Sequence, residues 1–155
     1  MSASRAISLG AISGLRSLSG PAFLSRAASK GLVSLDGTAL AFLGSPRLSK
    51  VLVIMELAEI IGDKLPITPS RTSPPILLGR AASGGLVGAV SSLSGDRPAA
   101  TGAALGSSAA VAAAFAAERL RALVGQKTGI PDPVVALAED AIVLLVGYRS
   151  LREGR

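Results

Sequence analysis

Residues 98–117, PAATGAALGSSAAVAAAFAA, contain no charged side chain. As an α-helix, a stretch of about 20 apolar and small residues is long enough to cross the hydrocarbon core of a bilayer. The whole chain of 155 residues has the same bias, with 49% apolar residues, only 17% charged residues and a mean hydropathy of +0.54. These values lie on the apolar side of ordinary soluble domains, so the sequence predicts a helical membrane protein.

Outward from this stretch, apolar segments alternate with short Gly, Pro, Ser and charged connections. They predict helices over residues 6–24, 32–43, 48–62, 76–93, 99–124 and 133–148. We expect an all-α, polytopic membrane bundle of five to six short helices in a single domain, residues 1–155. Segment 32–43 is too short to cross a bilayer and contains Asp36, so it is expected to be re-entrant or interfacial. A soluble Ala-rich bundle is the alternative, but it would carry more Glu and Lys.

The residue types that are absent exclude several kinds of chemistry. The chain has no cysteine and no histidine, which excludes disulfides, thiol catalysis and imidazole bases. No nucleotide-binding or serine-hydrolase motif is present, so an enzyme is the less favoured interpretation, and we assign no catalytic residue, cofactor or metal ligand. The net charge of +6 comes from basic residues scattered between apolar segments, and three Phe and one Tyr offer little base stacking. The sequence therefore predicts the lipid bilayer as a partner and no nucleic acid.

Three predicted helices carry glycines spaced four residues apart: Gly10 with Gly14, Gly84 with Gly88, and Gly102 with Gly106. In lipid, small residues on one helix face let two backbones approach closely. We expect these glycines to form helix-packing faces, either within the chain or in a homo-oligomer.

The two halves of the chain, residues 1–75 and 76–155, resemble each other. The segment SRAISLGAISGLRSLSG at residues 4–20 aligns without gaps with GRAASGGLVGAVSSLSG at residues 79–95, and LAE at 57–59 recurs at 137–139. If each half has three spans, the second half enters from the opposite side, as in the inverted repeats of transporters whose binding sites lie at the midplane. Under six spans the basic residues divide almost evenly between the two sides, so no orientation follows.

The segment MELAEIIGDKLPITPSRTSPP at residues 55–75 places acids on a strongly apolar helix. Glu56, Glu59 and Asp63 are three and four residues apart, so they share one helix face. Charges in a membrane segment face the bundle interior, a polar cavity or basic partners rather than lipid. The groups expected to join them in a substrate- or ion-binding site are Arg16, Lys64, Arg71, Glu139 and Asp140.

Two alternatives to an ion-binding site remain open for these charges. They are internal salt bridges that only pin helices together, or a carboxylate site for magnesium or calcium in a lipid enzyme. The proline-rich loop, with Lys64 and Arg71, is expected to bind an anion or a lipid head group, or to be only a connector. Glu59 and Glu139 occupy matching positions of the two halves, so we expect them to approach each other near the centre of the bundle.

Several motifs in the chain resemble one family. SGLRS at residues 13–17, GDKLPITPSRTSPP at 62–75, GR at 79–80, and GIPD followed by ALAED within 129–140 are similar to a bacterial family of small membrane proteins, the domain-of-unknown-function family four-one-two-six. The resemblance covers nearly the whole chain and implies an integral membrane protein. It implies no activity, substrate or catalytic residue.

Two kinds of function fit these features. The first is a transporter or channel in which the acidic helix face binds a proton, a cation or a small solute. The second is a non-catalytic membrane scaffold or accessory subunit held by glycine faces and internal ion pairs. A transporter needs a solvent-reachable cavity at the acids, whereas a scaffold needs them paired and sealed. Either protein is expected to be a multi-pass protein of the inner (plasma) membrane.

Overall fold

The computed structural model describes residues 3–62, 72–95 and 97–152. These residues form helices and connecting turns and contain no strand, so the all-α prediction is confirmed. The helices are α1 (Ala3–Leu15), α2 (Ser19–Ser29), the short 3-10 helix η1 (Ala41–Gly44), α3 (Pro46–Gly62), α4 (Pro74–Leu93), α5 (Ala99–Thr128) and α6 (Asp132–Arg152). Helices α3 to α6 correspond to those predicted over 48–62, 76–93, 99–124 and 133–148.

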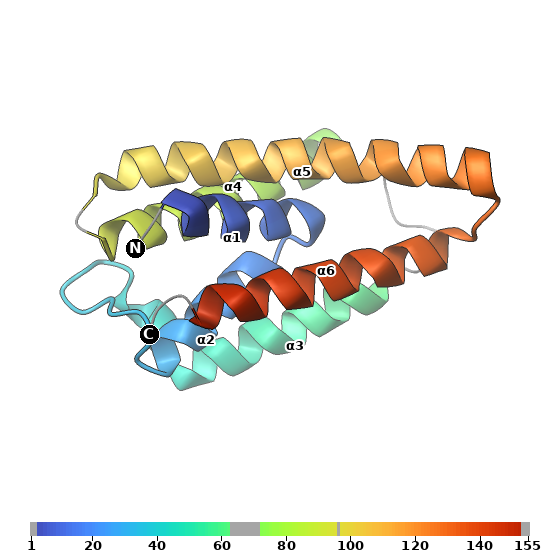
Figure 1. The fold of residues 1–155 in the computed structure, drawn as a ribbon. Coiled ribbons are helices and arrows are strands. Elements are labelled where there is room, and N and C mark those ends of the chain that lie inside the picture. The colour runs from blue at the N-terminus through green and yellow to red at the C-terminus, as the bar shows by residue number, and fades with distance from the viewer. Residues whose placement is uncertain (1–2, 63–71, 96, 153–155) are drawn as a thin grey trace.

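Helix α5, with 30 residues, is the longest, and α1 packs along it (Figure 1). A Cβ added to Gly10 would lie 2.5 Å from the carbonyl oxygen of Gly106, and one added to Gly14 would lie 2.1 Å from that of Ala110. These distances leave no room for a side chain, so the two backbones are in direct contact. Because residue numbers rise together along both helices, α1 runs in the same direction as α5.

Helix α4 packs on α5 through glycines as well. A Cβ added to Gly84 would lie 2.5 Å from the carbonyl oxygen of Gly106, and one added to Gly88 would lie 2.0 Å from that of Gly102. Here the residue numbers run in opposite senses, so α4 is antiparallel to α5 and to α1. The six glycines singled out in the sequence thus all lie at helix contacts inside the chain, which leaves none of their faces for a contact between two copies.

Helices α1 and α2 form a hairpin where the sequence predicts one helix over residues 6–24, and this prediction is wrong (Figure 1). A continuous helix would place Pro21 in its interior, where its ring and missing N–H disrupt the backbone hydrogen bonds. In the hairpin, Pro21 lies in the first turn of α2, where no N–H is needed. A Cβ at Gly20 would lie 2.0 Å from the hydroxyl oxygen of Ser13, so glycine lets α2 fold back closely on α1.

The connection between α2 and α3 contains no α-helix, so the helix predicted over residues 32–43 is also wrong. Gly31 and Gly37 have φ angles of 70° and 76°, which end α2 and turn the chain. Val33, Leu35 and Leu43 bury their side chains in the hydrophobic core. This burial explains why the segment is apolar although it forms turns and only the short helix η1.

Helices α3 and α5 run away from the N-terminus, and α4 and α6 return toward it (Figure 1). We call the end of the bundle that holds both chain termini, the end of α2 and the start of α3 the terminal end. The opposite end, with the turn between α5 and α6, is the far end. The described residues of both termini therefore lie together.

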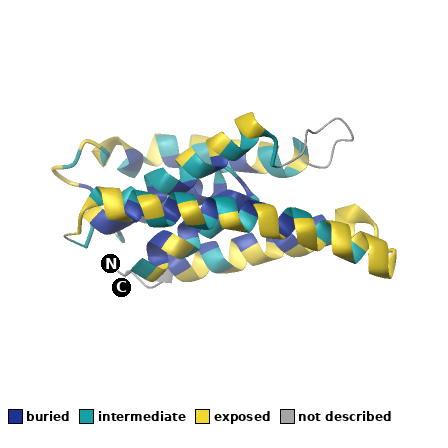
Figure 2. Cartoon of the chain, turned by 90° about the horizontal axis from the view of Figure 1, so that it is seen from above, coloured by how far each residue is buried: buried dark blue, intermediate teal, exposed yellow. Residues whose placement is uncertain are grey.

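The bundle carries charge inside and apolar side chains outside. In the described part of the chain, six charged residues are at most 7% exposed: Arg5, Arg16, Glu56, Arg80, Glu139 and Asp140. By contrast, Ile54, Ile61 and Leu78 are 65%, 67% and 70% exposed, and exposed faces follow the outer sides of the helices (Figure 2). Soluble proteins rarely bury charge or expose apolar side chains in this way. Helices α4 and α5 are long and apolar enough to cross a membrane, in agreement with the predicted class.

Candidate functional site

The candidate site is built around the turn of the α1–α2 hairpin, residues 15–19, which we call the hairpin tip. At this point α1 ends with carbonyl groups that have no partner within α1, and α2 begins with N–H groups that have no partner within α2. The partial negative charge of the α1 end and the partial positive charge of the α2 start lie only a few residues apart. Inside a bundle, both ends require partners from other helices.

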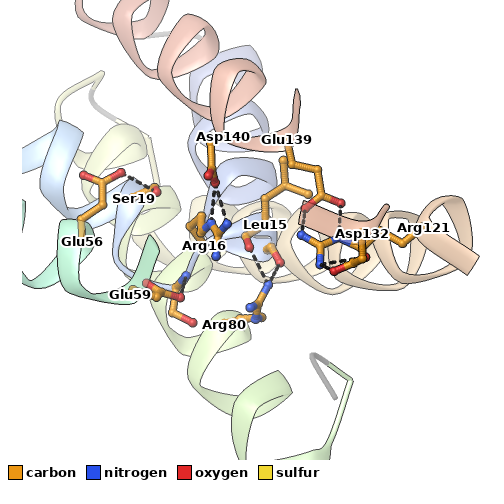
Figure 3. Close-up of polar contacts among 12 residues, drawn as sticks. Leu15, Arg16, Ser19, Glu56, Glu59, Arg80, Arg121, Asp132, Glu139 and Asp140 are labelled. Atoms are coloured by element: carbon orange, nitrogen blue, oxygen red, sulfur yellow. Dashed lines mark hydrogen bonds and ion pairs between the residues drawn. The ribbon is translucent and has the colours of Figure 1, made fainter. Parts of the chain in front are cut away.

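Arg80 of α4 satisfies the carbonyl side of the tip. Its Nη1 donates to the carbonyl oxygens of Gly14 and Leu15, the latter at 2.9 Å (Figure 3). Arg80 is 2% exposed, so its guanidinium group is enclosed by protein. A cation at a helix C-terminus is favoured by the helix dipole, which makes Arg80 a charged cap of α1.

Glu59 and Glu56 of α3 satisfy the other side of the tip. The two carboxylate oxygens of Glu59 accept the backbone N–H groups of Ser17 at 2.7 Å and of Leu18 at 2.9 Å. Glu56, one turn earlier on α3, accepts the hydroxyl of Ser19 at 2.6 Å. The spacing of three residues puts both acids on one face of α3, as the sequence predicts. A carboxylate at a helix N-terminus is favoured by the dipole, so Glu59 caps α2 as Arg80 caps α1.

The side chain of Arg16 leaves the tip toward α6 and meets Asp140. Its Nε and Nη2 donate to Oδ1 of Asp140 at 2.9 and 2.6 Å, and the side chains are 1% and 10% exposed. Ser83 of α4 adds a further bond, from its hydroxyl to the carbonyl oxygen of Ser17. In a continuous helix that carbonyl would accept from residue 21, which is proline and has no N–H. The tip is thus held by α3, α4 and α6 together.

Glu139 has a different partner from the one expected of it. Its carboxylate accepts from Nε and Nη2 of Arg121 on α5 at 3.0 and 2.7 Å, and Arg121 also contacts Asp132 at 3.1 Å. Glu59 turns toward the tip and Glu139 turns toward Arg121, on opposite sides of Arg16 (Figure 3). The expectation that these two acids meet is therefore wrong, because α6 presents Asp140, not Glu139, to the tip.

The remaining predicted site residues lie outside the described part of the chain, and one residue of the site was not predicted. Asp63, Lys64 and Arg71 lie outside the described residues. In the described part, no group of three or more His, Cys, Asp or Glu side chains could hold a metal ion. Sequence reasoning missed Arg80 as a site residue, although its position in a strongly apolar segment and its alignment with Arg5 were signals.

An apolar groove of about 520 Å³ reaches the tip from the side. Its walls come from α2, η1, α3 and α4 and include Leu43, Leu52 and Leu86. Ser17 of the tip and Ser83, which donates to it, also line the groove. The tip is therefore not sealed on every side by packed helices.

These contacts define an all-helical protein in which a broken helix is held at the centre of an apolar bundle by buried charges from three other helices. The chain belongs to the family described as Domain of unknown function (DUF4126), whose model matches residues 4–151. The family predicted from the motifs is thereby confirmed. No curated protein and no solved structure matches the chain.

Proposed function

We propose that this chain is a multi-pass protein of the plasma membrane whose hairpin tip binds a proton or a cation, as the site of a small transporter or channel. The observation that carries the proposal is the convergence of charged side chains from α3, α4 and α6 on a broken helix, inside a bundle with an apolar surface. Ionisable groups are expensive to bury in a membrane, and where they occur they mark ion or substrate pathways.

In this proposal α3, α4, α5 and α6 cross the membrane and the α1–α2 hairpin is re-entrant. The crossing helices have 17, 20, 30 and 21 residues, whereas α1 and α2 have only 13 and 11. At 1.5 Å per residue, a hydrocarbon core of about 30 Å requires about 20 residues. Non-helical backbone at membrane depth is tolerated where its polar groups find partners within the protein, and those of the tip bond to Glu59, Arg80 and Ser83. Four crossings and a hairpin take the place of five or six spans.

The balance of charge at the tip favours a bound cation or proton. Among the described residues, three carboxylates, of Glu56, Glu59 and Asp140, face two guanidinium groups, of Arg16 and Arg80. In a medium of low dielectric constant, an uncompensated negative charge is unfavourable, and a proton or a monovalent cation would neutralise it. Discontinuous helices near the midplane bind ions and substrates in known transporter folds, and the tip has the same design.

The inverted repeat belongs to the same proposal. The aligned motifs RSLSG at residues 16–20 and SSLSG at 91–95 both lie where a helix ends and the chain reverses. Helices α1 and α4 run in opposite directions along α5, as an inversion requires. The α1–α2 hairpin is then a shortened counterpart of the α4–α5 hairpin, and the shortening leaves its tip at the centre.

A re-entrant hairpin also gives the protein an orientation. It returns α2 to the terminal end, where these exposed basic residues of the described part gather: Arg26, Lys30, Arg47, Lys50, Arg97 and Arg149. At the far end, Arg119 and Lys127 are exposed, and Arg121 is engaged by Glu139 and Asp132. Cytoplasmic segments carry the excess of Lys and Arg, so the terminal end is proposed to face the cytoplasm.

Ion flux in reconstituted vesicles tests the proposed function. Vesicles that contain the protein should dissipate an imposed proton or sodium gradient faster than empty vesicles. Glu59→Gln should remove most of this flux, while Asp36→Asn, which changes an exposed acid in the connection between α2 and α3, should keep it. Circular dichroism and gel filtration of each variant establish that the fold is retained. Flux that is equal in the wild-type protein and in folded Glu59→Gln would refute the ion site.

The second candidate function is a membrane scaffold, and one observation favours it. Glu56, Glu59, Glu139 and Asp140 each have a hydrogen-bonding or ion-pair partner in the structure. A scaffold uses these contacts only to hold helices, so it predicts no flux in the wild-type protein and a less stable Glu59→Gln. Since the six glycines pack inside the chain, a homo-oligomer of such a scaffold would use other faces, such as the exposed apolar side chains Ile54 and Ile61 of α3 or Leu78 of α4.

A further inference from the structure

The apolar groove beside the hairpin tip ends at the proposed cation site. Ser17, Leu18 and Ser83 line its end at the tip, and Phe42 lines it where η1 is followed by α3, an end that we call the mouth. The walls are almost entirely apolar. Phe42 is 58% exposed, and Gly79 on the α4 wall is also exposed, so the groove opens on the outer surface of the bundle. In the proposed membrane placement this surface faces lipid.

A carboxylate lies at the tip end of the groove. Glu59 accepts the backbone N–H groups of Ser17 and Leu18 at 2.7 and 2.9 Å, and both of these residues line the groove. Leu48 and Leu52 of the α3 wall share a helix face with Glu59, because intervals of eleven and seven residues are close to three and two full turns. Glu59 is half-buried. An apolar groove thus leads to a negative charge.

The hydroxyl group of Ser17 is a second polar feature at this end. It makes no hydrogen bond with the described residues, whereas the backbone N–H and carbonyl of Ser17 bond to Glu59 and Ser83. Each oxygen of Glu59 accepts one N–H, and a carboxylate has about four acceptor positions, so acceptor capacity remains. Among the described residues the carboxylates of the tip outnumber its guanidinium groups, so the tip favours a positively charged ligand.

We propose that the groove binds a lipophilic amine from the bilayer, with its protonated amino group at the tip and its apolar chain along the walls. The amino group donates to the carboxylate of Glu59 and to the hydroxyl of Ser17, and it supplies the positive charge that the tip lacks. The chain removes the apolar walls from water. This inference names the cation of the proposed function, and it rests on that proposal for the charge of the tip and for its depth in the membrane.

The shape and charge of the groove distinguish a lipophilic amine from other occupants. A helix with side chains is about 10–12 Å across, too wide to enter a groove of about 520 Å³ between α2, α3 and α4. At a rise of about 1.5 Å per residue, Leu48 and Glu59 are about 16 Å apart along α3, close to the length of an extended chain of about twelve carbons. An alcohol of this length would fill the groove without neutralising Glu59, and a fatty acid would add a second negative charge.

Tryptophan quenching by bromine at the end of such a chain tests the proposal, because the protein has no tryptophan of its own. Phe42→Trp places a fluorophore at the mouth, where the chain would end, and Leu144→Trp places one on the exposed side of α6 as a control. In phosphatidylcholine vesicles at neutral pH, ω-bromododecylammonium should quench Phe42→Trp saturably, with half-quenching at a bilayer concentration about tenfold lower than for ω-bromododecanol. At Leu144→Trp the two compounds should quench alike.

Three variants, each combined with Phe42→Trp, separate the charge from the groove. Glu59→Gln should abolish the preference for the amine and keep quenching by the alcohol. Ser17→Ala removes a hydroxyl that bonds to no described residue, so it should weaken the preference without loss of the fold. Gly79→Leu narrows the groove at a position where an added Cβ meets nothing within 4 Å, so it should lower quenching by both compounds. The proposal fails if amine and alcohol quench Phe42→Trp alike, or if the preference is unchanged in folded Glu59→Gln or in Ser17→Ala.

Ion flux in the same vesicles separates this inference from the proposed function. Proton or sodium flux that depends on Glu59, without a preference for the amine, would refute the amine site and leave the ion site standing. A preference for the amine that depends on Glu59, without proton or sodium flux, would support the amine site and refute transport of these two ions.

Discussion

The packing of three helices around Gly106 gives the sharpest test of the fold. In Gly106→Ala, the new Cβ would lie 2.0 Å from the carbonyl oxygen of Gly84 and 3.1 Å from the Cα of Gly88. Real Cβ atoms essentially never approach closer than 3.0 Å, so α4 must move by about 1 Å relative to α5. Overpacking of this kind destabilises a fold by about 1–3 kcal/mol, and the gain in helix propensity from Gly to Ala offsets at most about 1 kcal/mol. We expect a net destabilisation of about 2 kcal/mol.

The matched control is Gly125→Ala in the same helix. An added Cβ at Gly125 meets nothing within 4 Å, so only the helix propensity changes, and the variant should be unchanged or more stable by up to about 1 kcal/mol. The free energy of unfolding, measured by titration with SDS in mixed micelles, compares both variants with the wild-type protein. Equal stabilities of Gly106→Ala and Gly125→Ala would refute the direct backbone contact of α4 with α5.

Three further predictions concern the buried charges and the orientation. Arg16→Met leaves Asp140 buried without its cation and should destabilise the fold by about 3–5 kcal/mol, and Arg16→Met with Asp140→Leu should recover most of that loss in the same SDS titration. Arg80→Gln replaces a charged cap of α1 by a neutral one and should destabilise by about 1–3 kcal/mol, whereas Arg119→Gln on the exposed surface should change stability by less than about 0.5 kcal/mol. A reporter enzyme that works only in the cytoplasm should be active when it is fused after residue 155, and a reporter that works only in the periplasm should be inactive there. Activity of the periplasmic reporter would contradict the proposed orientation.

The helices that the sequence predicts well are those with no proline in their interior. The segment 76–93 corresponds to α4 and the segment 99–124 to α5, because small and apolar residues there satisfy both helix formation and packing. The segment 6–24 has the same composition, yet Gly20 and Pro21 make the chain turn back after Arg16. Composition alone does not tell a crossing helix from two short helices, since the decision rests on one proline and on charged partners far away in the sequence.

The candidate site was predictable in its acids and only partly in its pairing. The spacing of Glu56 and Glu59 places them on one face of α3, and this local geometry follows from the helix period. The partners are set by tertiary packing: Arg16 reaches Asp140 across 124 positions of sequence, and Arg80 caps α1. The symmetry argument for Glu59 and Glu139 failed because α6 has a second acid one residue later, and that acid faces the tip.

The central claim is that residues 3–29 form a re-entrant hairpin whose charged tip lies within the membrane. Because the chain has no cysteine, single cysteines report their position by reaction with a membrane-impermeant thiol reagent. In sealed vesicles of defined orientation, Ser4→Cys and Lys30→Cys should be labelled from the same side and Lys127→Cys from the opposite side. Ser17→Cys should be labelled much more slowly than these three from either side. Labelling of Lys30→Cys from the side opposite to Ser4→Cys would show that residues 6–24 cross the membrane, and would contradict the hairpin and the site built on it.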